Sequence, residues 1–132
     1  MPQLQNLVLT DRAATPVAHT FAPRDITSGV GAVVESSGVP VGDSRYTISL
    51  RQTSSKKYVA TVKLSVPVVQ NQTVNGVTSP TVVRTGFAEA SFTFDPTSTE
   101  QERKDLVGMF ASSFDASKVL VNDTLVKLQG VY

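Results

Sequence analysis

The sequence predicts an α+β fold, in which a sheet of antiparallel strands is followed by two short helices. The first two thirds of the chain are rich in Val, Thr and Ser, and turn residues recur at short intervals, which is typical of strands joined by hairpins. In the middle of the chain polar and apolar side chains alternate, as in a strand with one buried face. After Asp95 the apolar residues fall at helical spacing instead.

Three short strands are expected in the N-terminal part. Leu4–Thr10 and Val17–Phe21 are apolar runs separated by polar turn residues, so we expect them to pair as an N-terminal β-hairpin. Val30–Glu35 is a third candidate strand, and the turn residues from Ser36 to Asp43 close it.

The alternation is strongest in the two segments that follow. The polar positions of the first segment are Arg45, Thr47, Ser49, Arg51 and Thr53. After a polar turn the alternation resumes at Tyr58, and the polar positions there are Thr61, Lys63 and Ser65. Pro67 has no N–H to give to a sheet, so we expect it to end the useful ladder of this strand.

A hairpin and a long strand are expected next. The uncharged segment Gln70–Pro80 contains Asn75-Gly76, a dipeptide that strongly favours a two-residue hairpin turn. This segment is either a plain hairpin tip or a contact element between subunits. The long strand Thr81–Phe94 follows it.

Two helices are expected in the last third. The pair Thr97–Glu100, or the pair Thr99–Glu102, has the spacing of a capping box that opens a helix. A second helix is expected from about Ala116, with Gly130 in position to stop it. A length of 132 residues predicts a single domain over 1–132, with strands in 1–94 and helices in 97–130. Because two short helices cover only part of a wide sheet, we expect an obligate dimer in which a second copy contributes its helices.

The composition argues against most enzymes. The chain has no cysteine and one histidine, His19, so thiolate or His-rich metal sites and cysteine nucleophiles are excluded. A small hydrolase would lack a credible general base, because His19 lies in the predicted edge hairpin and reads as a surface residue. We therefore expect no enzyme, no cofactor and no small-molecule substrate. We also expect no signal peptide and no membrane association, since no apolar run approaches the length of a membrane helix.

The formal net charge of +1 conceals an uneven distribution. Between Ser44 and Ala88 there are six Lys or Arg residues and no Asp or Glu, so the rest of the chain is acidic. A charge asymmetry of this kind points to a polyanionic partner.

The polar side of the central strands suggests which polyanion. Cations bind phosphates, hydroxyls bond to base edges, and Phe87 on the neighbouring strand is suited to stack on an unpaired base. A solvated strand face is the alternative for any single one of these residues. The complete absence of acids favours nucleic acid for the array as a whole.

Several strings carry a resemblance to a known family. They are Ser49–Ser54, Lys63–Pro67, Gln72–Val77 with Pro80, and the ending Gly130-Val131-Tyr132. With the order of strands and helices, they make the chain similar to the coat proteins of single-stranded RNA bacteriophages, the leviviruses. The resemblance covers essentially the whole chain.

The resemblance implies a fold and a function. It implies an N-terminal hairpin, a five-stranded antiparallel meander and two helices, with two subunits interlocked around a ten-stranded sheet. It also implies a homodimer that assembles into a T=3 icosahedral capsid and binds a hairpin in the phage genomic RNA. That binding represses replicase translation and promotes packaging. The location would be the virion, and the host bacterial cytoplasm before assembly.

The resemblance also implies the RNA-binding residues. Residues at the positions of an adenine pocket are Val30, Thr47, Ser49, Thr61 and Lys63. Basic phosphate contacts fall on Arg45 and Arg51, and further backbone contacts on Thr53 and Ser54. Phe87 stands where relatives have a stacking tyrosine, and Glu89 where they have an amide or hydroxyl that touches RNA. The alternative function is a cellular single-stranded RNA-binding module with an open sheet, although an RRM would need helices between its strands.

Overall fold

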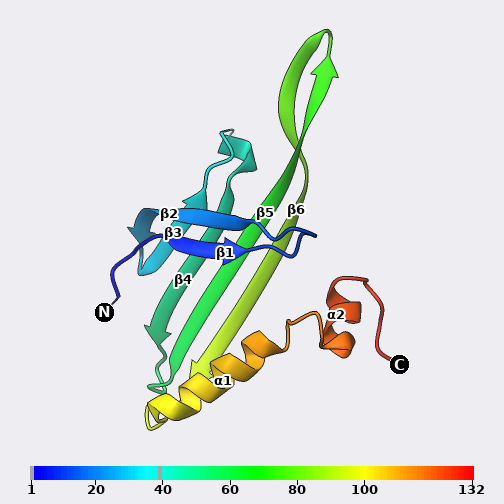
Figure 1. The fold of residues 1–132 in the computed structure, drawn as a ribbon. Coiled ribbons are helices and arrows are strands. Elements are labelled where there is room, and N and C mark those ends of the chain that lie inside the picture. Colours follow the sequence, from blue (N-terminus) through cyan, green and yellow to red (C-terminus); the bar gives the residue numbers. More distant parts are fainter. Residues whose placement is uncertain (1, 39) are drawn as a thin grey trace. The chain divides into compact units, whose positions relative to one another are not determined.

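The computed structural model describes residues 2–38 and 40–132, and it contains an antiparallel sheet and two helices (Figure 1). The elements are β1 (Leu7–Thr10), β2 (Ala18–Thr27), β3 (Val30–Glu35), the 3-10 helix η1 (Pro40–Gly42), β4 (Ser44–Gln52), β5 (Tyr58–Val74), β6 (Val77–Phe94), α1 (Glu100–Ser112) and α2 (Val119–Leu125). The strands form one sheet in the order β1-β2-β3-β4-β5-β6. The predicted α+β order is confirmed. The chain forms two compact units, Met1–Thr93 and Phe94–Tyr132, and the single domain over 1–132 stays a prediction.

The strand count differs from the expected hairpin plus five-stranded meander, because β2 has two partners. Its first half pairs with β1, from Ala18↔Thr10 to Phe21↔Leu7, as the N-terminal hairpin predicts. Its second half pairs with β3, and the register shifts between Pro23 and Asp25. A β-bulge of this kind bends a strand and increases its local twist. One strand of ten residues therefore pairs with two neighbours. The described residues form six strands, as the six predicted segments indicate, rather than the seven that the resemblance implies.

The registers of β3, β4 and β5 divide their side chains between two faces, because residues that pair across antiparallel strands point to the same side. We call one side the polar face; its residues are Val30, Ala32, Val34, Arg45, Thr47, Ser49, Arg51, Val59, Thr61, Lys63 and Ser65. We call the other side the apolar face; its residues include Val33, Tyr46, Ile48, Leu50, Ala60, Val62 and Leu64.

The N-terminal hairpin packs on the apolar face. A hollow of about 220 Å³ is lined by Leu9 of β1, Phe21 of β2 and Leu64 of β5, among others. Phe21 is 3% exposed and Val33 is 4% exposed, so the small core of the described residues centres on this contact. Burial of such side chains is the main term that holds the hairpin on the sheet.

The strands β5 and β6 are longer than predicted. Pro67 lies inside β5 rather than at its end, which corrects the expectation. The ladder between β4 and β5 ends at Arg45↔Ser65, so Pro67 lies beyond it and needs no N–H for β4. The segment Gln70–Pro80 is a continuation of both strands, and Figure 1 shows this two-stranded ribbon projecting past the other strands.

The tip of the ribbon confirms the predicted turn. Asn75 has φ 52° and Gly76 has φ 78°, which is the left-handed backbone that a type I′ hairpin turn requires. Ser28 (φ 52°) and Gly29 (φ 78°) form a second turn of the same kind between β2 and β3.

The helices confirm one of the two predicted starts. Thr99 is the N-cap of α1, its side chain accepts from the N–H of Glu102 at 3.2 Å, and the Glu102 carboxylate accepts from the N–H of Thr99 at 3.4 Å. The second helix is shorter than expected, because Asp115 and Ser117 form a separate turn before it. Gly130 does not stop this helix. The chain turns at Leu128, whose φ is 58°.

Many large apolar side chains of the described residues are exposed. On the apolar face Ile48 is 50% exposed and Leu50 is 63% exposed. Neither α1 nor α2 has a buried side chain. In residues 2–38 and 40–132, no helix has the length and apolar character needed to cross a lipid bilayer.

We predict that Thr99→Ala lowers the free energy of unfolding by about 1 kcal/mol, because it removes the acceptor of the α1 capping box. Thermal unfolding of matched preparations measures this loss. The control is Ser112→Ala, which removes a hydroxyl at the other end of the same helix and should leave stability equal or slightly raised. Equal stability of the Thr99 variant and the parent would contradict the role of the cap.

Candidate nucleic-acid interface

The predicted adenine-pocket residues lie in two adjacent rows across the polar face. In one row Ser49 of β4 pairs with Val30 of β3 and with Thr61 of β5. Directly opposite residues in an antiparallel sheet have Cβ atoms about 5 Å apart. These three side chains therefore present one apolar group and two hydroxyls side by side.

The second row supplies the cation. Thr47 of β4 pairs with Ala32 of β3 and with Lys63 of β5. Ala32 is fully buried, whereas Lys63 is exposed. The row thus combines a small buried side chain, a hydroxyl and an exposed ammonium group.

The two predicted phosphate contacts lie in the neighbouring rows, one on either side of these two. Arg45 pairs with Ser65, and Arg51 pairs with Val59. Both arginines are exposed, and no polar-face position of β3, β4 or β5 holds an acid. The structure therefore brings together seven of the predicted residues, and it places three cations around hydroxyls with no carboxylate between them.

Thr53 and Ser54 lie in the turn that joins β4 to β5. The N–H of Thr53 donates to the carbonyl of Lys57 at 2.8 Å, and its hydroxyl lies 3.0 Å from that of Ser55. Lys56 has φ 65° and lies in the same turn. Ser54 is exposed. These two residues therefore lie beyond the rows rather than within them, at the end next to Arg51.

Phe87 and Glu89 belong to β6, which neighbours β5 in the sheet. They are two residues apart, so both point to the same side of their strand. Phe87 is 82% exposed, which is unusual for a ring of this size and leaves its face free to stack. That the two side chains extend the rows of the polar face stays a prediction.

One residue on the polar face was missed by sequence reasoning. Asp25 of β2 pairs with Ala32, so it adds a carboxylate to the row that contains Thr47 and Lys63. It was missed because the second strand was expected to end at Phe21. The signal that would have found it is Ser28-Gly29, which suits a two-residue turn between paired strands.

The levivirus coat protein family model matches residues 2–132. The chain belongs to the levivirus coat protein family. It is 60% identical over 130 residues to the capsid protein of Pseudomonas phage PRR1, which covers 98% of this chain and 99% of that protein. It is 38% identical over 108 residues to the capsid protein of Qbeta virus (strain MX1), covering 78% and 80% of the two chains. Among solved structures, the virus-like particle of bacteriophage ESE058 matches with a TM-score of 0.85 at 26% identity, covering 99% and 100%.

Family membership confirms the predicted class of protein. This levivirus coat protein is a structural component of a virion rather than an enzyme. The likeness of its fold to that of the virus-like particle confirms the sheet followed by two helices. The eleven RNA-binding residues and the RNA itself stay predictions.

Proposed function

We propose that this coat protein forms dimers that assemble into a T=3 icosahedral shell, and that its polar face binds a hairpin in the phage RNA. Binding of that hairpin represses replicase translation and marks the genome for packaging. Before assembly the protein works in the host cytoplasm. The observation that carries the RNA part is the row arrangement of Ser49 with Thr61 and of Thr47 with Lys63, flanked by arginines on strands without acids.

Open apolar surface supports the dimer. Ile48 and Leu50 on the apolar face, like Leu106 and Met109 of α1, are between 41% and 68% exposed in the single chain. Soluble monomers rarely leave so many large apolar side chains uncovered. A second copy offers the same surfaces in return, as a two-fold interface requires.

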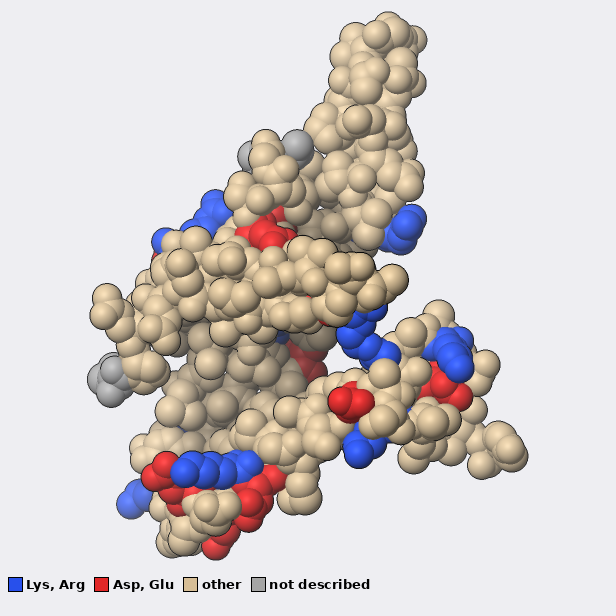
Figure 2. All heavy atoms as spheres, viewed as in Figure 1, with Lys and Arg blue, Asp and Glu red and all other residues tan. Residues whose placement is uncertain are grey.

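The β5–β6 ribbon supports closer assembly. In Figure 2 its projecting end carries neither the blue of Lys and Arg nor the red of Asp and Glu. Val74 and Val77 at its tip are 64% and 67% exposed. Because several copies of an uncharged ribbon meet without charge repulsion, this segment suits the contact between subunits around a symmetry axis.

The alternative, a cellular RNA-binding module, is less favoured. In the part of the chain that the structure describes, no α-helix lies between consecutive strands of the sheet, which is not the order of an RRM. Membership of a coat protein family also favours a capsid function.

Closed shells of uniform size are expected in electron micrographs of the purified protein, and sedimentation should give only shells and dimers. The reason is that a monomer leaves large apolar side chains exposed on the apolar face and on both helices, such as Leu50, Met109 and Leu120. A well-populated, folded monomer at micromolar concentration would refute the dimer.

Lys63→Ala should weaken binding of an RNA stem-loop with an unpaired adenine. It should also reduce the magnitude of the slope of log affinity against log salt by about 1, since one cation near the phosphates is lost. Filter binding at several salt concentrations measures both quantities. The matched control is Lys104→Ala on α1, which should leave the slope unchanged. The same slope for the Lys63 variant and the parent would mean that Lys63 does not face the RNA.

Glu89→Asn should leave the affinity for the same stem-loop equal or raise it, because a carboxylate near phosphates is repelled. The charge-matched control is Glu102→Gln on α1, for which no change is expected. A loss of tenfold or more, roughly 1.4 kcal/mol, would instead indicate a direct bond from Glu89 to a base, such as a cytosine amino group.

A further inference from the structure

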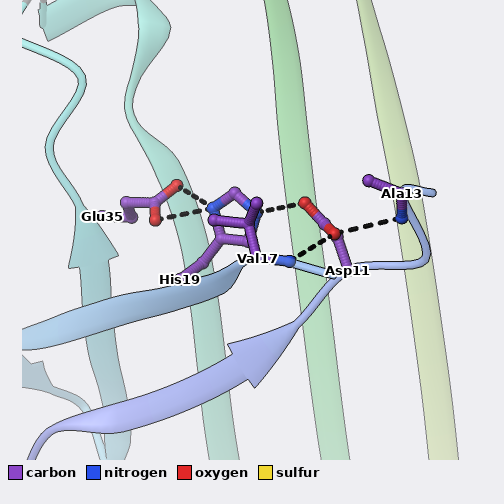
Figure 3. A network of polar contacts seen from close by, with 5 residues as sticks. All are labelled: Asp11, Ala13, Val17, His19 and Glu35. Atoms are coloured by element: carbon purple, nitrogen blue, oxygen red, sulfur yellow. Dashed lines mark hydrogen bonds and ion pairs between the residues drawn. The ribbon is translucent and has the colours of Figure 1, made fainter. Parts of the chain in front are cut away.

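The imidazole of His19 lies between two carboxylates that come from different parts of the chain (Figure 3). Its Nε2 is 2.7 Å from Oδ2 of Asp11, in the segment after β1. Its Nδ1 is 2.8 Å and 3.1 Å from the two carboxylate oxygens of Glu35, at the end of β3. We call these three side chains the His19 bridge.

The geometry favours a doubly protonated imidazole. A carboxylate oxygen only accepts hydrogen bonds, and a neutral imidazole has one N–H to donate. Both ring nitrogens face carboxylates at the same time, so both can donate to them only when the imidazole is doubly protonated. The hydrogen bonds to Asp11 and then to Glu35 accordingly raise the pKa of His19, and the bond to His19 lowers the pKa of Asp11 to about 2.

The bridge connects the turn of the N-terminal hairpin to β3. Oδ1 of Asp11 accepts from the N–H groups of Ala13 and Val17, at 3.1 Å and 3.0 Å. The N–H of Asp11 donates to the carbonyl of Val17 at 3.0 Å. Asp11 therefore organises the turn, while its other oxygen binds the imidazole. β1 has four residues and pairs with β2, so this link reaches past β2 to the third strand.

Among the described residues, the lining of the hollow adds no further titratable side chain to the three of the bridge. Beside its own three residues, the hollow under the hairpin is lined by Leu9, Thr10, Phe21, Ser44, Leu64 and Val66, from β1, β2, β4 and β5. The two ring nitrogens point in opposite directions, so the three residues do not converge on a point where a metal ion would bind. A proton on the imidazole is what joins the two acids.

We propose that the His19 bridge is a pH-sensitive latch that fastens the N-terminal hairpin to β3 while the imidazole is charged and loosens it when the proton leaves. This property belongs to the folded chain and does not depend on the RNA function proposed above. A neutral ring keeps one of the two hydrogen bonds and turns a lone pair toward the other carboxylate, which repels it.

The direction of the pH dependence follows from the two pKa changes. His19 has a raised pKa, so its contribution to stability is complete below about 6.5 and is lost as the pH rises through its value in the fold. Asp11 has a lowered pKa, so its contribution is present above 3.8 and is lost as the pH falls toward about 2. The latch is thus closed in mildly acidic solution and opens on the alkaline side.

The test uses the fact that His19 is the only histidine in the sequence. Slow exchange of its Cε1 hydrogen in deuterated buffer, followed by mass spectrometry, reports the pKa of this one ring in dimers or in shells alike. The expected pKa lies above 6.5 and falls in Glu35→Gln. The pKa of His19 should not fall in the control Asp25→Asn. This variant also removes a carboxylate, but from the part of β2 that faces the opposite side of the sheet from His19. A parent pKa at or below the ordinary value, or equal falls in both variants, would overturn the bridge.

Backbone amide exchange tests the loosening itself. Amides in peptides that cover residues 7–21 should exchange severalfold faster at about pH 8.5 than at about pH 5.5. This ratio of rates is divided by the ratio for a β4 peptide, which corrects for base-catalysed exchange. In Glu35→Gln this excess should disappear, because the link to β3 is already lost. Should the excess be missing in the parent, or persist undiminished in the variant, the latch is refuted even if the pKa of His19 is raised.

Discussion

The register of β3, β4 and β5 is the constraint on which both surfaces of the sheet depend. In a strand the side chains alternate with a period of two, so a slip of one residue would exchange the two faces of a whole strand. Thr47, Ser49 and Lys63 would then turn to the side of the core, and Ile48 and Leu64 to the other. The gathering of Arg45, Arg51 and Lys63 on one face is therefore a consequence of backbone pairing. The alternation in β4 and in residues 60–65 of β5 favours that pairing.

The folded chain is incomplete by itself in a physical sense. Its described core contains four buried apolar residues, Phe21, Ala32, Val33 and Val59, while helices α1 and α2 bury no side chain. In the proposed dimer, a second copy would cover exposed apolar residues, so stability would depend on assembly. Because the chain has no cysteine, no disulfide can link subunits, and contacts between them depend on packing and electrostatics.

Local patterns in the sequence predicted those features that neighbouring residues determine. The alternation from Arg45, the Asn75-Gly76 turn and the Thr99–Glu102 cap are each set within a few residues, and all three are confirmed. Features that depend on pairing between distant segments were predicted poorly. Pro67 is tolerated because β4 no longer faces it, and that is visible only once the register is known.

The candidate site follows the same rule. Seven of its residues come from alternating strands and share the polar face as predicted, whereas Asp25 was missed because β2 continues through a bulge. The partners of His19 are 8 and 16 residues away in the sequence. The sequence around His19 does not predict a carboxylate at each ring nitrogen, because strand pairing brings Glu35 to the ring and a turn brings Asp11 to it.

The bulge at Arg24 has a consequence for how the chain tolerates length changes. It adds one residue between Pro23, which pairs with Val33, and Asp25, which pairs with Ala32. That extra residue reverses the parity of β2, so that Phe21 and His19 serve one side of the sheet and Asp25 the other. If Arg24 were deleted, the side chains of one half of β2 would point to the wrong side of the sheet. The turn at Asn75-Gly76 joins the parts of β5 and β6 that lie beyond the ladder with β4. Extra residues in this turn would therefore leave the pairing of β4 with β5 unchanged. Changes in chain length should therefore disturb the sheet at the bulge in β2 and be tolerated at the tip of the β5–β6 ribbon.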